Sequence, residues 1–332
     1  MKKILIIGGC GFIGHNLAIH LKDLKYEVNV VDGLNVNNLY NFKENIGNND
    51  FYRLVLNSRL DLLNNNKITY QITDARDYHA LSKIMGTCKP DVVVHLAAVS
   101  HANKSNKDPH STFDHSLRTL ENALDSSRTV KAHFIYLSSS MVYGNFDGQT
   151  VEENRILNPI GIYGTLKMCG EYIVKSYSQV FELPFTIIRP SALYGERCVS
   201  RRVGQIFIEN AIRGQKITIN GDGEEKLDFT YIKDLVQGIA LCIENEKSKN
   251  EIFNLTYGEG REINDLIEIL RKKFPSIEIE KKEREKFTPE RGTLSINKAK
   301  NLIKYNPIYP IEKGYISYIN WYSNFFKDKI KN

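Results

Sequence analysis

The first fifteen residues read Met1-Lys-Lys-Ile-Leu-Ile-Ile7-Gly8-Gly9-Cys10-Gly11-Phe12-Ile13-Gly14-His15, and this stretch decides the fold. Its apolar run predicts a β-strand, which passes through Gly-x-x-Gly-x-x-Gly into a helical pattern. Glycines at these positions permit a tight turn, a close approach of the backbone to a pyrophosphate and close packing of helix on strand. The free N–H groups at the start of the helix favour phosphate. We therefore expect this stretch to bind a dinucleotide.

An acidic residue ends each of the next two predicted strands. Asp32 follows the strand at residues 28–31, where a carboxylate can accept hydrogen bonds from the hydroxyls of the adenosine ribose. No arginine is adjacent to Asp32 in the sequence, which favours NAD over NADP because a 2′-phosphate would face a carboxylate. Asp74 ends the third strand and could accept the adenine amino group, although a simple cap of the strand end would explain it as well.

Apolar runs and helical patterns alternate along residues 1–190. Several runs are continuous Val, Ile and Leu, as in strands that are buried on both faces of a parallel sheet. The alternation predicts a doubly wound α/β fold, that is, a parallel Rossmann sheet with right-handed crossovers. The asparagine-rich segment 34–66 is weakly periodic, and we expect a long loop with short helices there. Strands are predicted at residues 3–7, 28–31, 68–72, 92–97, 133–137 and 185–188, and helices at residues 11–24, 78–85, 116–127 and 163–181.

The pattern changes after Pro190. Two helices and two short strands are predicted beyond it, at residues 203–213, 263–274, 216–220 and 252–255. We therefore expect a smaller C-terminal α/β cap that binds the substrate. In this interpretation residues 1–190 form the NAD-binding Rossmann domain, residues 191–332 form mainly the cap, and the chain returns to the first domain around residues 229–258.

Tyr163 and Lys167 stand one helical turn apart and therefore share a face of their predicted helix. A free phenol is a poor base at neutral pH, but a neighbouring ammonium favours the phenolate. Tyr163 can then take the proton of an alcohol while a hydride leaves the same carbon. The cluster Ser138-Ser139-Ser140 ends the fifth predicted strand, which places Ser139 at the edge of the sheet where ligands of such folds bind.

The composition excludes several other classes of protein. The chain has 332 residues, of which 42% are hydrophobic and 25% charged, and its net charge is +6. Its basic runs are short, so we expect no nucleic-acid partner. No apolar run approaches the ~20 residues of a membrane span. The five cysteines lack ligand spacing, which predicts reduced thiols, a cytoplasmic protein and no bound metal. His101 and His115 are interpreted as loop histidines beside the substrate pocket.

Seven motifs, spread over nearly the whole chain, support a family resemblance. They are Gly8-Gly-Cys-Gly-Phe-Ile-Gly14, His95-Leu-Ala-Ala98, Ser138-Ser-Ser-Met-Val-Tyr-Gly144, Tyr163-x-x-x-Lys167, Ile188-Arg-Pro-Ser-Ala-Leu-Tyr-Gly195, Asp228-Phe-Thr-Tyr-Ile-Lys-Asp234 and Phe253-Asn-Leu255. Together they resemble the extended short-chain dehydrogenase/reductase family of NAD-dependent nucleotide-sugar epimerases and dehydratases.

The resemblance implies a nucleotide-diphospho sugar as substrate, NAD as cofactor and a homodimer. It implies that Ser139 hydrogen-bonds the sugar hydroxyl being oxidised, that Tyr163 is the base and that Lys167 holds the nicotinamide ribose. Further cofactor contacts are implied at Gly8, Gly11, Phe12, Ile13 and Ala97.

The two residues after Ser139 distinguish branches of this family. Dehydratases place Asp-Glu there, and decarboxylases and C5 epimerases tend to place an acid or a cysteine second, whereas this chain has Ser140 and Met141. A thioether cannot give or take a proton, so deprotonation at C5 has no evident agent. We therefore expect an epimerase that oxidises and re-reduces C4. The first alternative is a 4-dehydrogenase that releases the keto sugar. Less favoured alternatives are a 4,6-dehydratase, a reductase of small carbonyls and a family member without catalytic activity.

Contacts to the substrate are less clearly marked. Leu227 stands where relatives have an arginine. We expect Arg202 and Arg291, or else Arg201, to bind the diphosphate, because a guanidinium suits bidentate contact with phosphate. A surface ion pair would explain each of these arginines equally well. Ser140 is expected to contact the sugar.

Overall fold

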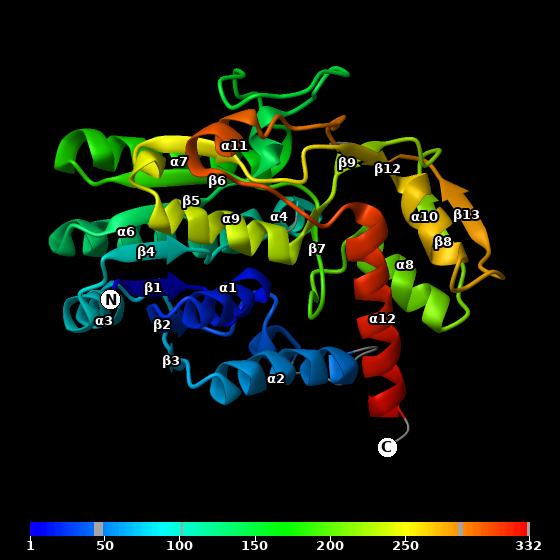
Figure 1. Cartoon of the computed structure of the whole chain (residues 1–332), viewed down its shortest axis with the longest axis horizontal. Helices are drawn as coiled ribbons and strands as arrows, with labels where there is room; N and C mark the ends of the chain where they lie inside the picture. The colour runs from blue at the N-terminus through cyan, green and yellow to red at the C-terminus, as the bar shows by residue number, and fades with distance from the viewer. Residues whose placement is uncertain (43–48, 101, 285–287, 331–332) are drawn as a thin grey trace.

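The computed structural model describes residues 1–42, 49–100, 102–284 and 288–330 (Figure 1). Its centre is a seven-stranded sheet in the order β11-β6-β5-β4-β1-β2-β3, in which all neighbouring strands are parallel. The doubly wound parallel sheet expected from the sequence is therefore confirmed. The winding reverses between β1 and β4, which opens a crevice at the carboxyl ends of these strands. The strands are β1 (Lys3–Ile7), β2 (Glu27–Asp32), β3 (Thr69–Ile72), β4 (Val92–His95), β5 (His133–Leu137), β6 (Phe185–Arg189) and β11 (Glu251–Asn254).

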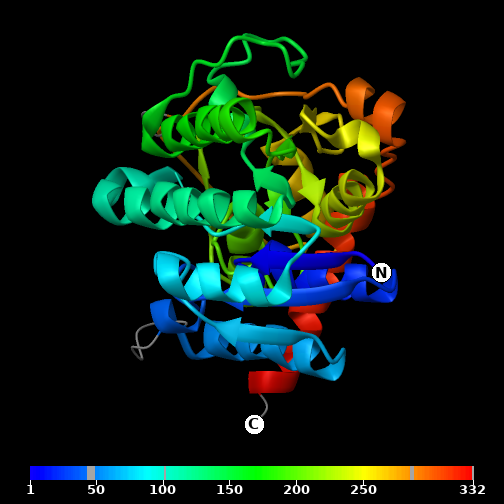
Figure 2. The ribbon, with the colours of Figure 1, turned by 90° about the vertical axis from the view of Figure 1, so that its left-hand side faces the viewer.

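Helices cover both faces of this sheet (Figure 2). Successive side chains of β1 enter opposite cores: Ile4 and Ile6 enter the first, and Leu5 and Ile7 enter the second. Both faces of the strand are buried, which explains its continuous apolar run. The first core is covered by α1 (Phe12–Asp23), α2 (Asn49–Asn65) and α9 (Ile232–Glu244), and the second by α3 (Tyr78–Cys88), α6 (Thr119–Val130) and α7 (Gly161–Phe181).

The expectation of a long loop at residues 34–66 is wrong, because a 17-residue helix, α2, occupies most of its second half. Asparagines at both ends of this helix dilute its periodicity. Phe51 also packs against Tyr322 of the C-terminal helix, with ring centroids 5.8 Å apart, so contacts from distant sequence stabilise α2. Its buried apolar side chains, at helical spacing, are Phe51, Tyr52, Val55, Leu56 and Leu63.

A smaller α/β layer lies at one end of the sheet (Figure 1). Strand β8 (Ile217–Asn220) pairs in parallel with β13 (Ile279–Lys282), and β9 (Lys226–Asp228) pairs antiparallel with β12 (Gly260–Glu262). A third pair, β7 (Leu193–Tyr194) and β10 (Thr230–Tyr231), joins this layer to the central sheet. Further helices are α4 (Ala102–Lys107), α5 (Pro109–Phe113), α8 (Val203–Ile212), α10 (Ile263–Arg271), α11 (Asn297–Ile303) and α12 (Ile311–Ile330).

Asp228 joins the smaller layer to neighbouring segments. Its buried carboxylate accepts hydrogen bonds from Thr256 Oγ1 at 2.9 Å, Gly258 N at 3.1 Å and Leu294 N at 3.1 Å. Burial raises the pKa of Asp228 to about 7, and these donors oppose that rise. The Asp-Phe motif therefore has a structural explanation.

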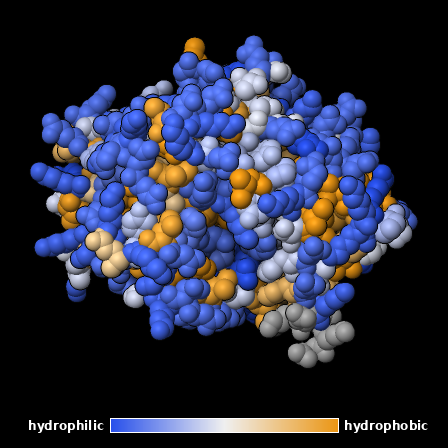
Figure 3. All heavy atoms as spheres, viewed as in Figure 1, coloured by the Kyte–Doolittle hydropathy of each residue, from blue (hydrophilic) through white to orange (hydrophobic). Residues whose placement is uncertain are grey.

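The surface seen in Figure 3 is mostly hydrophilic, with scattered hydrophobic side chains. Within the described part of the chain, no helix combines the length and the apolar composition needed to cross a bilayer. The five cysteines, all of which belong to the described residues, carry free thiols.

Candidate active site

The glycine turn joins β1 to α1 at the carboxyl edge of the sheet. Gly8 has a φ of +83°, and a Cβ there would lie 2.8 Å from the backbone nitrogen of Ala97. Any other residue at this position would therefore be strained and would crowd the end of β4. Gly11 precedes α1, and Phe12 and Ile13 form its first turn. All five residues line one groove, so the structure brings these expected cofactor contacts together.

Asp32 ends β2 and lines the same groove. Its carboxylate accepts hydrogen bonds from Cys10 N at 2.9 Å and Leu34 N at 2.7 Å. Burial raises the pKa of Asp32, while these backbone donors act to lower it. The sequence did not predict the buried guanidinium of Arg59 on α2, which also lines the groove and donates from Nε to the carbonyl oxygen of Arg197 at 3.1 Å. Burial lowers the pKa of Arg59 to about 10, so it stays charged at neutral pH.

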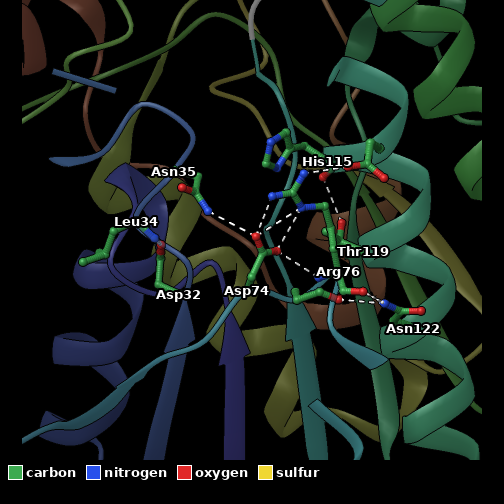
Figure 4. A network of polar contacts seen from close by, with 10 residues as sticks. Asp32, Leu34, Asn35, Asp74, Arg76, His115, Thr119 and Asn122 are labelled. Carbon is green, nitrogen blue, oxygen red and sulfur yellow. Dashed lines mark hydrogen bonds and ion pairs between the residues drawn. The ribbon is translucent and has the colours of Figure 1, made fainter. Parts of the chain in front are cut away.

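Asp74 lies across the groove in a network of polar contacts (Figure 4). Its Oδ2 accepts from Arg76 Nη2 at 2.6 Å and from Asn35 Nδ2 at 3.2 Å. Hydrogen bonds from the side chain and the backbone N–H of Arg76 lower the pKa of Asp74. Arg76 also pairs with Asp114 at 2.6 Å, which ties the end of β3 to the turn before α6. Asp74 is therefore ionised and fixed in position, and an adenine amino group would share its oxygens with Arg76.

Ser139, Tyr163 and Lys167 line a second cavity, of about 480 Å³, beside the groove. Ser139 follows β5, and its Oγ accepts a hydrogen bond from Met141 N at 3.2 Å. Tyr163 lies in the first turn of α7 and is half-buried. Ile13 is among the residues that line both the groove and the cavity, so the two are continuous. The structure thus brings together the three residues that the sequence suggested for proton transfer.

Lys167 lies next to a buried ionic network formed by Glu171 and Arg189. Lys167 Nζ donates to Leu137 O at 2.6 Å. Burial lowers the pKa of Lys167 to about 8, and the carboxylate of Glu171, one helical turn further along α7, acts to raise it. Glu171 is itself buried, pairs with Arg189 at 2.6 Å and accepts a hydrogen bond from Ser138 Oγ at 2.5 Å. The end of β5 and helix α7 are therefore held in register beneath the site.

The side chains next to Ser139 include no acid. Ser140 and Met141 both line the cavity, and Ser140 Oγ is buried without a hydrogen-bond partner among the described residues. Glu225 is the only described cavity-lining residue with a carboxylate, and it comes from the turn before β9. The cavity therefore offers hydroxyl groups and a thioether beside Ser139.

Guanidinium groups gather on the cap side of the cavity. Arg202 precedes α8, lines both the groove and the cavity, and donates to Ser100 O at 3.0 Å. Arg291 lines the cavity with a buried Nε that has no hydrogen-bond partner among the described residues. Burial lowers the pKa of Arg291. Arg201 and Arg284 also line the cavity, so this side attracts anions such as a diphosphate.

Three charged residues of the site lie outside every motif singled out from the sequence: Arg59, Glu225 and Arg284. Arg59 stands at helical spacing from Val55 and Leu56, which are buried, and this spacing was the one signal that the sequence offered. His115 lines the dinucleotide groove from a helical turn, so the expectation of a loop histidine beside the substrate pocket is wrong for it. His101 lies outside the described residues. Within those residues, no group of three or more His, Cys, Asp or Glu side chains could hold a metal ion.

The groove fits a dinucleotide. Gly8 and Gly11 line the groove without side chains, and the start of α1 presents free N–H groups, as a pyrophosphate requires. Asp32 and Asp74 supply acceptors on one side, and Lys167 lies in the adjoining cavity. These residues could hold NAD with its nicotinamide toward Tyr163.

Comparisons with known proteins agree with this fit. The model of the NAD dependent epimerase/dehydratase family matches residues 4–256. An uncharacterized UDP-glucose epimerase of Bacillus subtilis is 29% identical over 331 residues, which cover 98% of this chain and 99% of the relative.

Two crystal structures are similar over nearly the whole chain. UDP-glucose 4-epimerase from Thermotoga maritima, solved with UDP-glucose, is 26% identical with a TM-score of 0.85 and covers 98% of this chain and 99% of its own. UDP-glucuronic acid 4-epimerase from Bacillus cereus, solved with UDP-glucuronic acid and NAD, is 28% identical with a TM-score of 0.84 and covers 97% of this chain and 99% of its own. The chain belongs to the NAD-dependent epimerase/dehydratase family.

Proposed function

We propose that this protein is a C4 epimerase of nucleotide-diphospho sugars, which oxidises the sugar at C4 and reduces it again from the opposite face. One observation supports this most directly: Ser139, Tyr163 and Lys167 line one cavity, where the second residue after Ser139 is Met141 and not an acid. The cavity opens into the dinucleotide groove, so that C4 of a sugar and a nicotinamide can meet there.

In the proposed mechanism Tyr163 moves the proton. Its phenolate takes the proton of the C4 hydroxyl and later returns it to the same oxygen. The buried ammonium of Lys167 stabilises the phenolate. Ser139 donates a hydrogen bond to the C4 oxygen and fixes its position. Bound NAD supplies the acceptor for the C4 hydride and the donor that returns it.

We propose that the remaining residues divide the two ligands between them. The cofactor contacts are Gly8, Gly11, Phe12, Ile13, Asp32, Asp74 and Ala97, together with Lys167. The proposed substrate contacts are Ser140 to the sugar, and Arg202 and Arg291 to the diphosphate. Residues 1–190, with a return around residues 229–258, would form the NAD-binding domain, and residues 191–332 would form mainly the substrate-binding cap.

We also propose a homodimer that forms through α7. This helix exposes Tyr172, Val180 and Phe181, with relative accessibilities of 56%, 70% and 46%. Large apolar side chains gathered on one helix favour contact with a second copy. Light scattering should give twice the chain mass, and a monomer would contradict this.

Product analysis tests the proposed activity. The protein is incubated with uridine, thymidine and guanosine diphospho-hexoses, and the products are identified by NMR. We expect the C4 epimer of the substrate and no 4-keto-6-deoxy sugar, because elimination needs an acid or base at the place of Met141. Accumulation of that product would favour a 4,6-dehydratase, and a released 4-keto sugar with its C6 hydroxyl intact would favour a 4-dehydrogenase.

A further inference from the structure

Glu225 is a lone negative charge in a cavity with five positive side chains. The other charged residues that line it, within the described part of the chain, are Lys167, Arg201, Arg202, Arg284 and Arg291. A cavity that only had to bind a diphosphate would gain nothing from a carboxylate, which repels phosphate oxygens. Glu225 therefore needs another explanation.

Two buried polar atoms here lack hydrogen bonds. They are the acceptor Glu225 Oε1 and the donor Arg291 Nε, and neither has a hydrogen-bond partner among the described residues. Buried polar groups are usually hydrogen-bonded, and leaving one without a partner is costly. A ligand that donates to Glu225 and accepts from Arg291 would satisfy both atoms at once.

The backbone holds Glu225 in place. Its carbonyl oxygen accepts a hydrogen bond from Ile263 N at 3.2 Å, and Gly223 O accepts one from Asn264 N at 3.0 Å. Gly223 has a φ of +87°, and a Cβ there would collide with the side chain of Asn264. The turn is therefore packed against the start of α10, and Glu225 reaches the cavity from the cap.

Arg291 lies within electrostatic reach of both Glu225 and the proposed base. Burial lowers the pKa of Arg291, while Glu225 and, more weakly, Tyr163 act to raise it. In a nucleotide sugar, the diphosphate links the sugar to the ribose. If Tyr163 faces the sugar and Arg291 the diphosphate, the group next to Arg291 on the other side is the ribose.

An ion pair with Arg284 does not account for Glu225. The two side chains are 3.8 Å apart and are 23% and 37% exposed, and Arg284 is also 3.6 Å from Glu290. A long, partly exposed ion pair of this kind contributes little to stability. A variant at residue 225 should therefore fold.

We propose that Glu225 accepts hydrogen bonds from the ribose hydroxyls of the substrate, and that the enzyme therefore selects ribonucleotide sugars over 2′-deoxyribonucleotide sugars. A carboxylate only accepts hydrogen bonds, and its two oxygens can serve the two hydroxyls of a ribose. This inference rests on the proposed function, because it needs a nucleotide-sugar substrate.

Calorimetric titration of the NAD-loaded protein tests this proposal. The probes are UDP, 2′-deoxy-UDP and 3′-deoxy-UDP, with GDP, CDP and their deoxy forms added if UDP binds weakly. We expect each missing hydroxyl to weaken binding by ~10- to 100-fold in the wild type. In Glu225→Ala the preference for the ribonucleotide should fall below about threefold. Glu225→Leu, which keeps much of the side-chain volume but has no acceptor, serves if the alanine variant does not fold.

The matched control is Glu224→Ala, which removes the same charge from the adjacent, exposed residue. It should keep the full preference for ribonucleotides. Equal binding of UDP and 2′-deoxy-UDP by the wild type, or an undiminished preference in the Glu225 variants, would overturn the proposal and leave the epimerase assignment intact. If no nucleoside diphosphate binds the wild type, both proposals fail.

Discussion

The two sides of the candidate active site are built in different ways. On the cofactor side, functional residues stand at the ends of parallel strands: Asp32 ends β2, and Ser139 follows β5. On the cap side, Arg202 precedes a helix, Glu225 lies in a turn and Arg291 follows β13. The first group is placed by one sheet, whereas the second meets through loops that are distant in sequence.

This difference has a physical cause and a functional consequence. Parallel strands end at a common edge, so residues at strand ends meet there whatever loops follow. Cap residues depend on contacts between loops and helices, such as the hydrogen bond from Ile263 N to Glu225 O. We expect residues placed by the sheet to govern chemistry and cofactor choice, and the cap residues to govern substrate affinity.

Tyr163→Phe should have the largest effect. It removes the proposed proton acceptor and keeps the ring, so kcat should fall on the order of 10³- to 10⁴-fold while NAD and substrate still bind. Steady-state kinetics measure the change in kcat, and calorimetry measures the binding of NAD and substrate. Tyr78→Phe, at an exposed position on α3, is the control and should be fully active. Near-normal turnover in Tyr163→Phe would show that Tyr163 is not the base and would contradict the assignment of the chemistry to the cofactor side.

Arg291→Met tests the cap side. The variant removes a guanidinium that we assign to the diphosphate, so KM should rise ~10- to 100-fold with kcat nearly unchanged. Arg271→Met, at an exposed position on α10, is the matched control. A fall in kcat at unchanged KM would contradict the division between the two sides.

Asp32→Asn tests cofactor choice. Loss of the negative charge removes its repulsion of a 2′-phosphate, so the preference for NAD over NADP should weaken about tenfold. The protein is equilibrated with NAD and NADP together, and the ratio of the two dinucleotides that it retains measures the preference. Asp23→Asn, at an exposed position, is the control. A wild type that retains NADP as well as NAD would show that Asp32 does not set the choice.

The pH dependence should be the mildest effect. Burial lowers the pKa of Lys167 to about 8, below its value in the unfolded chain, so the ammonium is lost as the pH rises through 8. Activity that depends on this charge should be halved near pH 8, although the same group makes folding more favourable as the pH rises from 8 toward the unfolded value. Activity that stays constant to pH 10 would show that the charge of Lys167 is not required.

The residues of the cofactor side could be proposed from the sequence because their signals are local. A glycine turn after an apolar strand and an acid at the next strand end each fall within a few residues of their structural cause. Tyr163 and Lys167 needed only helical spacing. The structure places all of these residues along the groove and the cavity.

Residues that depend on tertiary contacts could not be predicted in this way. Asparagines stand at both ends of helix α2, and its burial depends on partners such as Tyr322, more than 250 positions away. Arg59 reaches the groove only because α2 packs there. Glu225 belongs to no motif, and its position depends on the packing of its turn against α10.

Turnover without added cofactor tests the central claim most directly. Epimerisation returns the hydride that it removes, so no net oxidant is consumed. The purified protein should interconvert C4 epimers of a nucleotide sugar without added NAD, as followed by NMR, and should release bound dinucleotide when denatured. A cofactor-free protein that turns over only with stoichiometric NAD, and yields a keto sugar, would contradict the account.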